Sequence, residues 1–369
     1  MIKKILIGFI VALCLFAVGW NAYQSEKQAT DTTIKIGVIL PLTGASAHMG
    51  NAAKAAAELA FENAIKKGTK YDYRLVLEDD GMDTTKTMTR AQRLIFQENV
   101  KALVSFAAGP GKTIKSLAET NKIIHFGWTT DPTIAEGKYN FIHSTQPDVS
   151  AEKFVETFVK KGLNNISFVT LNHNGVAPIV SEVSKRLKAK GIRIVGQHTF
   201  DLGMRDFRIL LLKASQEKPD IYFFCSFAAE MENIRRQMLE ADIKIPVTSV
   251  DCLDLLKDTS LYEGAWFVGD AMQKNPELLK RIQTEKKVAP TRGTPFIYDI
   301  VQLLIWAYEN TPVKTGESVP TNEDVIKTIQ DKIGDYPSVF GNISVSPEGI
   351  VHTDALVKKI EGGKVILDE

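Results

Sequence analysis

Short apolar runs alternate with amphipathic helical segments along most of this chain. The runs have the length of strands and are rich in β-branched and aromatic residues. Some of them, such as residues 166–169, carry no charge, which is typical of strands covered on both faces. We expect strands at residues 35–40, 74–79, 102–106, 123–126, 140–143, 165–170, 193–198, 221–225, 246–250 and 264–268.

The segments between these runs have helical periodicity. We expect helices at residues 51–65, 84–98, 113–120, 150–161, 177–190, 204–217 and 229–241. Regular alternation of strands and helices indicates an α/β fold with parallel sheets and helices on both faces. So many strands exceed what one sheet of this kind usually holds, so we expect two doubly wound lobes.

The regular alternation of strands and helices ends after Asp270. Residues 275–287, 295–310 and 322–332 read as helices, and residues 340–345 and 355–360 as strands. A chain that completes two lobes and then adds further elements is expected to cross back between them.

The first residues resemble an export leader. Lys3 and Lys4 precede an apolar run at residues 5–19. Three fates stay open: cleavage after the small residues at 17–19, retention as a membrane anchor because the run approaches spanning length, and lipidation at Cys14. We therefore expect residues 1–33 to be a leader plus linker and the rest to lie outside the cytoplasm, in the periplasm or its equivalent. No later stretch has the length and apolarity of a membrane span.

Composition places few further constraints. The chain has 369 residues, which suits two domains, with 44% apolar and 24% charged residues. The formal net charge of +1 and the lack of a basic, aromatic cluster give no reason to expect nucleic acid as a partner.

Beyond the leader, Cys225 ends one expected strand and Cys252 comes directly after the end of another, and a helix-length segment separates them. Adjacent parallel strands would bring them close enough for a disulfide in an oxidising compartment. The alternative is a pair of buried free thiols. Their spacing is not that of metal ligands.

Catalytic, metal-binding and cofactor motifs are not found. The chain lacks His-Glu-x-x-His, Gly-x-Ser-x-Gly and Gly-x-Gly-x-x-Gly. Gly111-Lys112-Thr113 matches the end of a phosphate-binding loop, but Phe106 stands where that motif needs glycine. We therefore expect no enzyme, no metal and no cofactor, with an exported hydrolase kept as an alternative.

Several short sequence motifs occur in a specific order and spacing along the chain. They are Ile36-Gly37-Val38-Ile39-Leu40-Pro41-Leu42-Thr43-Gly44 followed by Gly50, Glu78-Asp79-Asp80-Gly81, Asp206-Phe207, Pro219-Asp220-Ile221-Tyr222-Phe223, Tyr298-Asp299, and residues 340–349. Together they resemble the type I periplasmic solute-binding proteins, in the branched-chain amino acid branch that serves ABC transporters. The resemblance covers nearly everything after residue 33.

That resemblance implies two lobes joined by three crossovers, the third near residues 336–340. Residues 34–148 and 271–337 would form the first lobe, and residues 149–270 and 338–369 the second. A small polar ligand, an amino acid or a related compound, would sit between lobes that close on it, and a membrane permease would receive it. A membrane-tethered sensor or envelope regulator on the same fold is the alternative.

In the first lobe, Ala108 and Gly109 follow the third expected strand and precede a helix, where free backbone N–H groups favour a carboxylate. A simple glycine turn is the alternative. Met49 is expected to touch the ligand from the same lobe.

The loop after the fourth strand adds three candidates. Trp128 is either a cleft aromatic or a packed side chain. By resemblance, Thr129 offers its backbone to the ligand, and Asp131 stands where the family has a threonine. Alternatively, Asp131 caps a helix that starts at Pro132.

In the second lobe, the resemblance places Asp251 where the family holds the ammonium group of its ligand; the alternative is a helix cap. Asp251→Asn should then weaken binding with little change in the stability of the empty protein. Phe227 stands where an aromatic covers the ligand. Asn174 lies in a polar loop that has a tyrosine-glycine pair in the family.

Overall fold

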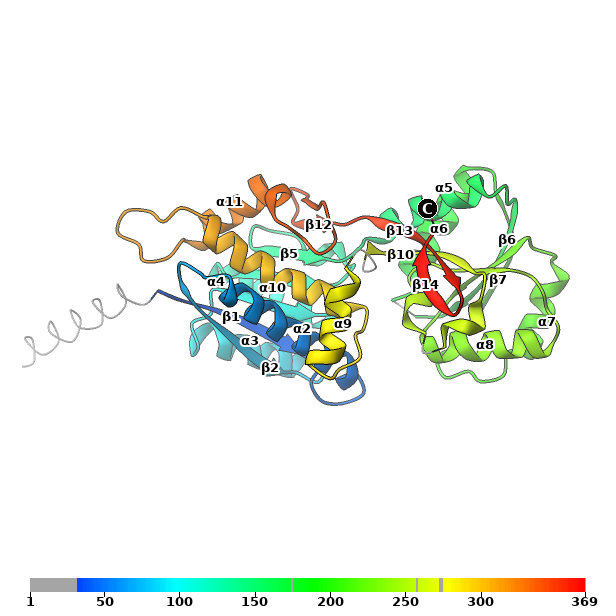
Figure 1. Ribbon diagram of the computed structural model, residues 1–369, viewed down its shortest axis with the longest axis horizontal. Coiled ribbons are helices and arrows are strands. Elements are labelled where there is room, and N and C mark those ends of the chain that lie inside the picture. Colours follow the sequence, from blue (N-terminus) through cyan, green and yellow to red (C-terminus); the bar gives the residue numbers. More distant parts are fainter. Residues whose placement is uncertain (1–31, 174, 257, 272–274, 369) are drawn as a thin grey trace, which may run out of the picture.

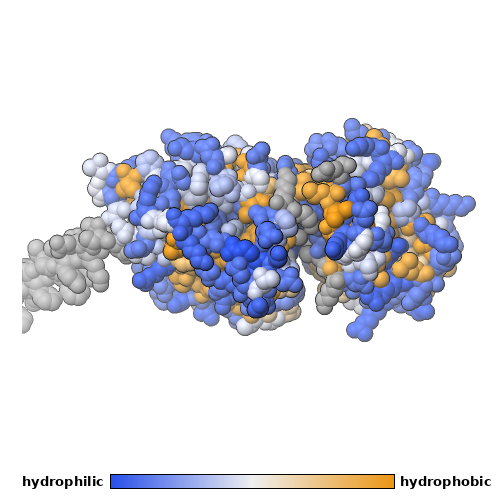
Figure 2. Space-filling model, viewed as in Figure 1, coloured by the Kyte–Doolittle hydropathy of each residue, from blue (hydrophilic) through white to orange (hydrophobic). Residues whose placement is uncertain are grey.

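The computed structural model describes residues 32–368 except 174, 257 and 272–274. The expected leader therefore lies outside the described residues. Two rounded bodies lie side by side and join through a narrower waist (Figures 1 and 2). In the part of the chain that the structure describes, every helix is too short or too polar to cross a bilayer.

The first lobe is built on a seven-stranded sheet in the order β11-β12-β5-β4-β3-β1-β2. The pairing is parallel from β12 to β2 and antiparallel between β11 and β12. The strands are β1 (Thr33–Leu40), β2 (Asp72–Asp79), β3 (Ala102–Phe106), β4 (Ile124–Trp128), β5 (Asn140–His143), β11 (Ser344–Val345) and β12 (Ile350–His352).

Helices cover both faces of this sheet. On one face α2 (Ala47–Lys66) packs against α10 (Gly293–Asn310), and on the other α3 (Thr84–Phe96) packs against α4 (Ala108–Asn121). Successive residues of β1 serve the two faces in turn. Ile36 and Val38 lie in the core under α2 and α10, whereas Ile39 lies in the core under α3 and α4. This alternation is why an uninterrupted apolar run forms a strand here.

The second lobe has two shorter sheets in the orders β7-β6-β8-β9 and β10-β13-β14. A parallel bridge between Val250 and Val268 joins them into one continuous layer. The strands are β6 (Asn165–Leu171), β7 (Arg193–Phe200), β8 (Ile221–Cys225), β9 (Val247–Thr248), β10 (Trp266–Asp270), β13 (Ala355–Glu361) and β14 (Lys364–Leu367).

Four helices surround this layer. They are α5 (Pro147–Lys160), α6 (Ala177–Ala189), α7 (Arg208–Gln216) and α8 (Ala228–Glu240). Helix α5 packs on α6, β10 and β13, and α7 packs on α8. Phe154 of α5 connects helix and sheet, because its ring contacts those of Phe223 and Trp266. The remaining helices, α9 (Pro276–Glu285) and α11 (Asn322–Lys332), belong to the first lobe.

The chain passes between the lobes three times: from β5 to α5, from β10 to α9, and from β12 to β13. The first passage leaves the carboxyl end of β5, and the second leaves the carboxyl end of β10. Since β3, β4 and β1 run parallel to β5, and β8 and β9 parallel to β10, the carboxyl ends of the central strands in both lobes face the waist.

The third passage lies later in the chain than expected. Residues 338–352 were assigned to the second lobe, yet β12 pairs with β5 of the first sheet. The crossing comes only between His352 and Ala355. Phe340 explains this, because its ring stacks on Phe296 of α10 and keeps the segment in the first lobe.

Candidate functional site

The loops at the carboxyl ends of the central strands are the place to look for a site, because open parallel sheets bind ligands there. The predicted site residues that the structure describes lie at such strand ends or in the segments that follow them. Met49, Ala108, Gly109, Trp128, Thr129 and Asp131 lie in the first lobe, and Phe227 and Asp251 in the second. Asn174 lies outside the described residues.

Helix α4 starts directly at the end of β3. The residue before it, Ala107, has φ of 75°, so the chain turns sharply from strand to helix, and no side chain caps the helix. The N–H groups of Ala108 and Gly109 open its first turn, and Pro110 contributes none. An uncapped helix start of this kind favours an anionic group. The helix therefore begins at Ala108, not at residue 113 as expected.

Trp128, at the end of β4, is the aromatic candidate of the first lobe. Its ring lies 4.3 Å from that of Phe106, centre to centre, so the side chain is partly a packed residue. Its indole Nε1 is nonetheless buried and has no hydrogen-bond partner. A buried donor without a partner costs about 1–3 kcal/mol. A ligand atom that accepts from Trp128 would recover that free energy.

Asp131 is engaged within its own loop. Its Oδ1 accepts hydrogen bonds from the backbone N–H and the hydroxyl of Thr133, which caps the short helix at Pro132–Ile134. Its Oδ2 lies 2.7 Å from Nζ of Lys112. Burial opposes charging, but these contacts win and lower the pKa of Asp131. The capping alternative thus describes what Asp131 does here, and Lys112 balances its charge.

Thr129 and Met49 are the remaining first-lobe candidates. Thr129 is buried, and its hydroxyl accepts a hydrogen bond from the N–H of Asp131. Met49, in the first turn of α2, packs partly buried against the first-lobe core. Helix α2 can start so close to β1 because of Gly50. A Cβ there would lie 2.0 Å from the carbonyl oxygen of Pro41.

Asp251 is the most constrained candidate. It is 3% exposed, and its backbone has φ of 62°, in the left-handed region that aspartate tolerates better than most residues. Its Oδ2 accepts a hydrogen bond from Nη2 of Arg292 at 2.5 Å. Its Oδ1 is buried without a partner. The carboxylate therefore has one oxygen occupied and one available.

Asp251 lies with four other charged residues of the described chain, and we call this set the waist cluster: Asp251, Asp254, Asp270, Arg292 and Lys358. All but Arg292 have almost fully buried side chains. Nζ of Lys358 lies 2.7 Å from Asp254 and 3.8 Å from Asp270, and Nε of Arg292 lies 4.0 Å from Asp270. Within the waist cluster, the unpartnered Oδ1 of Asp251 is suited to one positive group of a ligand.

Burial and the charges of the waist cluster together shift the pKa of Asp251. Burial is the main cause that raises it, to about 6, and Asp270 and Asp254 raise it further, while Arg292 and Lys358 act in the opposite direction. Burial lowers the pKa of Arg292, but Asp251 and Asp270 outweigh that effect and raise it. Near neutral pH both residues are therefore charged.

Arg292 was not expected from the sequence. It immediately precedes α10, where Gly293 brings the backbone against Phe106 and Trp128. Arg292 thus joins the first-lobe helix to the second-lobe loop that holds Asp251. A lone arginine in a polar stretch carries no pattern that marks such a role.

Phe227 is 41% exposed at the start of α8. Its ring meets that of His173 edge to face, with centres 5.0 Å apart. His173 lies in the loop after β6, so two loops of the second lobe present aromatic rings together. An exposed phenylalanine at a strand end is available to cover a ligand.

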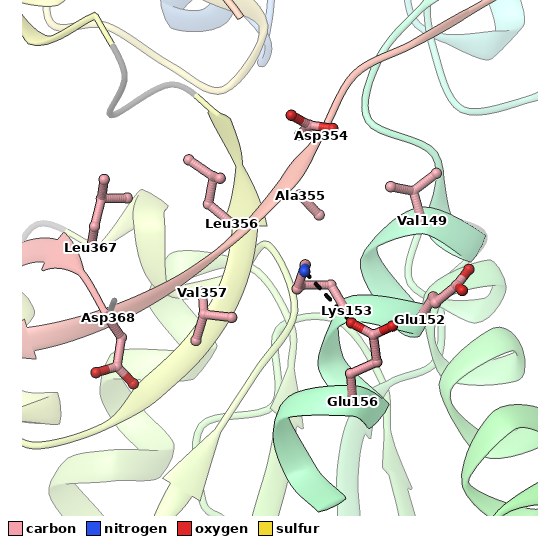
Figure 3. A pocket seen from close by; sticks show the side chains of 10 residues that line it. All are labelled: Val149, Glu152, Lys153, Glu156, Asp354, Ala355, Leu356, Val357, Leu367 and Asp368. Carbon is pink, nitrogen blue, oxygen red and sulfur yellow. Dashed lines mark ion pairs between the residues drawn. The ribbon is translucent and has the colours of Figure 1, made fainter. Parts of the chain in front are cut away.

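Two hollows lie away from these loops. One of about 540 Å³ opens between α5 and β13, and Figure 3 shows Glu152, Lys153 and Glu156 on one wall and Leu356 and Val357 on the other. Lys153 pairs with Glu156 at 3.5 Å. The second, of about 430 Å³, lies at the start of β9 and β10. Neither contains a predicted site residue.

A family model described as "Periplasmic binding protein" matches residues 33–364. Leu/Ile/Val-binding protein homolog 2 of Brucella abortus is 24% identical over 94% of this chain and 93% of its own length. An uncharacterized protein of Methanocaldococcus jannaschii is 26% identical over 50% of this chain, and the match spans about half, 47%, of that protein.

Solved structures share the fold. A branched-chain amino acid ABC transporter ligand-binding protein of Burkholderia xenovorans has a TM-score of 0.77 at 19% identity, over 89% of this chain and 90% of its own. A solute-binding protein of an ABC transporter from R. palustris, solved with benzoate, has a TM-score of 0.72 at 18% identity, over 91% and 95%.

Proposed function

Since the chain belongs to the periplasmic binding protein family, we propose that it is an extracytoplasmic receptor that binds a small polar ligand between its two lobes for an ABC transporter. Its relatives are solute-binding proteins rather than enzymes. The observation that carries the proposal is topological. The carboxyl ends of the central strands in both lobes face one waist, and unpartnered polar atoms lie on both of its sides.

The ligand we propose is an amino acid or a close relative. Its carboxylate lies at the start of α4, near the N–H groups of Ala108 and Gly109, where a helix N-terminus favours negative charge. Its ammonium group lies at Oδ1 of Asp251, which is buried and has no partner. The buried Asp251 carboxylate, which is ionised near neutral pH, favours a cation at that point.

Aromatic side chains complete the ligand's surroundings. Trp128 offers an indole N–H without a partner, and Phe227 offers an exposed ring. A relative is called Leu/Ile/Val-binding protein homolog 2, and a structural neighbour was solved with benzoate. Branched-chain amino acids and benzoate both combine a carboxylate with an apolar body. We therefore assign the same combination to the ligand of this chain.

A ligand that contacts both lobes favours closure of the lobes around it. A molecule that contacts both the start of α4 and Asp251 binds the closed form better than the open form, and so shifts the population toward closure. Arg292 contacts Asp251 between the two lobes, so closure would move this pair. The permease then distinguishes the closed lobes from the open ones.

A thermal-shift screen of the twenty amino acids, their amides and simple aromatic carboxylates tests the proposal. A ligand should raise the melting temperature by mass action, and scattering should show a smaller radius of gyration in its presence. Amides and decarboxylated amines should bind more weakly than the matching amino acids. A ligand that binds equally well to Asp251→Asn and Trp128→Ala would refute the site.

A further inference from the structure

Two cysteines lie next to each other behind the waist cluster. Cys225 ends β8, and Cys252 follows Asp251 in the loop after β9. Their Sγ atoms are 3.0 Å apart, and both side chains are buried, 0% and 7% exposed. In the structure both are free thiols.

The surrounding backbone already holds this arrangement. Strands β8 and β9 pair in parallel, and the hydroxyl of Ser249 donates to the carbonyl of Phe224 at 2.6 Å. The strand ends that carry the two thiols are therefore fixed by contacts that do not depend on sulfur.

We propose that Cys225 and Cys252 form a structural disulfide in the mature protein. A disulfide has an S–S bond of about 2.05 Å, so the sulfurs need to approach by only about 1 Å. Members of this family work outside the cytoplasm, where such bonds persist.

The chemistry is thiol–disulfide exchange with a disulfide donor, either a protein oxidant or a small molecule such as oxidised glutathione. The thiolate of one cysteine attacks the donor and forms a mixed disulfide, releasing one donor thiol. The second cysteine, as thiolate, attacks the first cysteine's sulfur and releases the other donor thiol. Two protein thiols are oxidised, and one donor disulfide is reduced to two thiols.

The bond has a structural consequence for the neighbouring residue. Asp251 holds a left-handed backbone conformation, with φ of 62°, immediately before Cys252. A crosslink at Cys252 ties the loop to β8 and so keeps Asp251 against Arg292. The proposed disulfide would therefore stabilise the conformation of the loop after β9 at Asp251.

Peptide mapping tests the bond directly. Protein taken from the extracytoplasmic fraction is denatured in acid, alkylated without reductant and digested. The expected result is a linked pair of peptides containing Cys225 and Cys252, lighter by two hydrogen atoms than their sum, which separates after reduction. Full alkylation of both cysteines without reduction, even after refolding with oxidised glutathione, would overturn the proposal.

Melting temperature gives a second readout with matched controls. A disulfide between residues 225 and 252 restricts the unfolded chain and so stabilises the folded protein. We expect the oxidised protein to melt about 5–10 °C higher than the reduced protein. Cys225→Ala, Cys252→Ala and the double variant should each melt at the same temperature with and without reductant. The same dependence on reductant in the double variant would contradict the assignment.

Discussion

Nη2 of Arg292 lies 2.5 Å from Oδ2 of Asp251, and this contact joins the first-lobe helix α10 to the second-lobe loop after β9. Asp251 is almost fully buried, whereas 22% of the Arg292 side chain stays exposed. The pair thus marks the place where the candidate site meets the passages between the lobes. Changes to either residue should affect both binding and stability.

The Asp251→Asn variant tests the ammonium-binding role. It removes a charged hydrogen bond, so an amino acid should bind about 10- to 100-fold more weakly, or about 1.5–3 kcal/mol. Isothermal titration calorimetry measures this change. Asp242→Asn is a matched control, because Asp242 also has a positive φ of 52° but its side chain is 83% exposed. Unchanged affinity in Asp251→Asn would exclude Asp251 from the site.

The same variant should also destabilise the empty protein, contrary to the expectation from sequence. Asp251 is buried against Arg292, so its loss leaves a poorly compensated cation. Asp270 remains 4.0 Å from Arg292, which limits the loss to about 1–3 kcal/mol. Urea unfolding of the empty proteins would show it. Identical midpoints for wild type and variant would mean that the ion pair contributes nothing.

Ligand affinity should depend on pH through Asp251. Its pKa is raised to about 6, mainly by burial, and an ammonium group binds only the ionised carboxylate. Affinity should therefore be constant above about pH 7 and fall by up to tenfold per unit below pH 6. Calorimetry at three pH values measures the slope. The slope should vanish in Asp251→Asn; its persistence there would assign the proton to another group.

His125 should make the stability of the first lobe sensitive to acid. Burial lowers its pKa to about 4, although Asn140 acts in the opposite direction, so the folded state holds the imidazole neutral. Because the folded pKa is depressed below the unfolded value near 6.5, its contribution is fully present above pH 6.5. About 3 kcal/mol should be lost as pH falls from 6.5 to 4. Urea unfolding of wild type and His125→Gln should differ in this slope, whereas His352→Gln, at a partly exposed site, should keep it.

Lys358 and Lys359 offer a matched pair on β13. Lys358 is fully buried beside Asp254, whereas Lys359 is partly exposed and pairs with the exposed Glu361. Lys358→Met removes the buried cation that lies 2.7 Å from the Asp254 carboxylate and should cost about 3–5 kcal/mol. Lys359→Met should cost less than about 1 kcal/mol. Equal losses in chemical denaturation would refute the importance of the waist cluster for folding.

Gly293→Ala tests the close contact below Trp128. A Cβ at Gly293 would lie 2.8 Å from Phe106 and 3.1 Å from Trp128. The variant should lose about 1–3 kcal/mol of stability and shift the Trp128 ring, with weaker ligand binding and altered fluorescence. Gly334→Ala is the control, because nothing lies within 4 Å of its added Cβ. Equal effects of the two changes would rule out the packing argument.

The hydrophobic pattern of the sequence predicted the fold well, because strands buried on both faces appear as short, uncharged apolar runs. The expected ranges of β3, β5 and β8 match the structure residue for residue. The start of α4 was missed because Gly109, Pro110 and Gly111 have low helix propensity. Tertiary contact explains that start: Gly111 packs closely against Ile134, where a Cβ would lie only 2.8 Å away.

The sequence predicted the site less completely than the fold. Strand ends could be located from the pattern, so candidates such as Trp128 and Asp251 follow from position. Arg292 could not, because its role depends on a contact with a residue 41 positions away. The third passage was misplaced for the same reason, since β12 is held by pairing with the distant β5.

The three passages also mean that neither lobe is one contiguous stretch of sequence. Strand β12 joins the first sheet and β14 joins the second, and residues of the other lobe separate each of them from the earlier strands of its sheet. A cut of the polypeptide at any one passage would therefore leave at least one sheet without some of its strands, so the lobes are not expected to fold as separately expressed fragments.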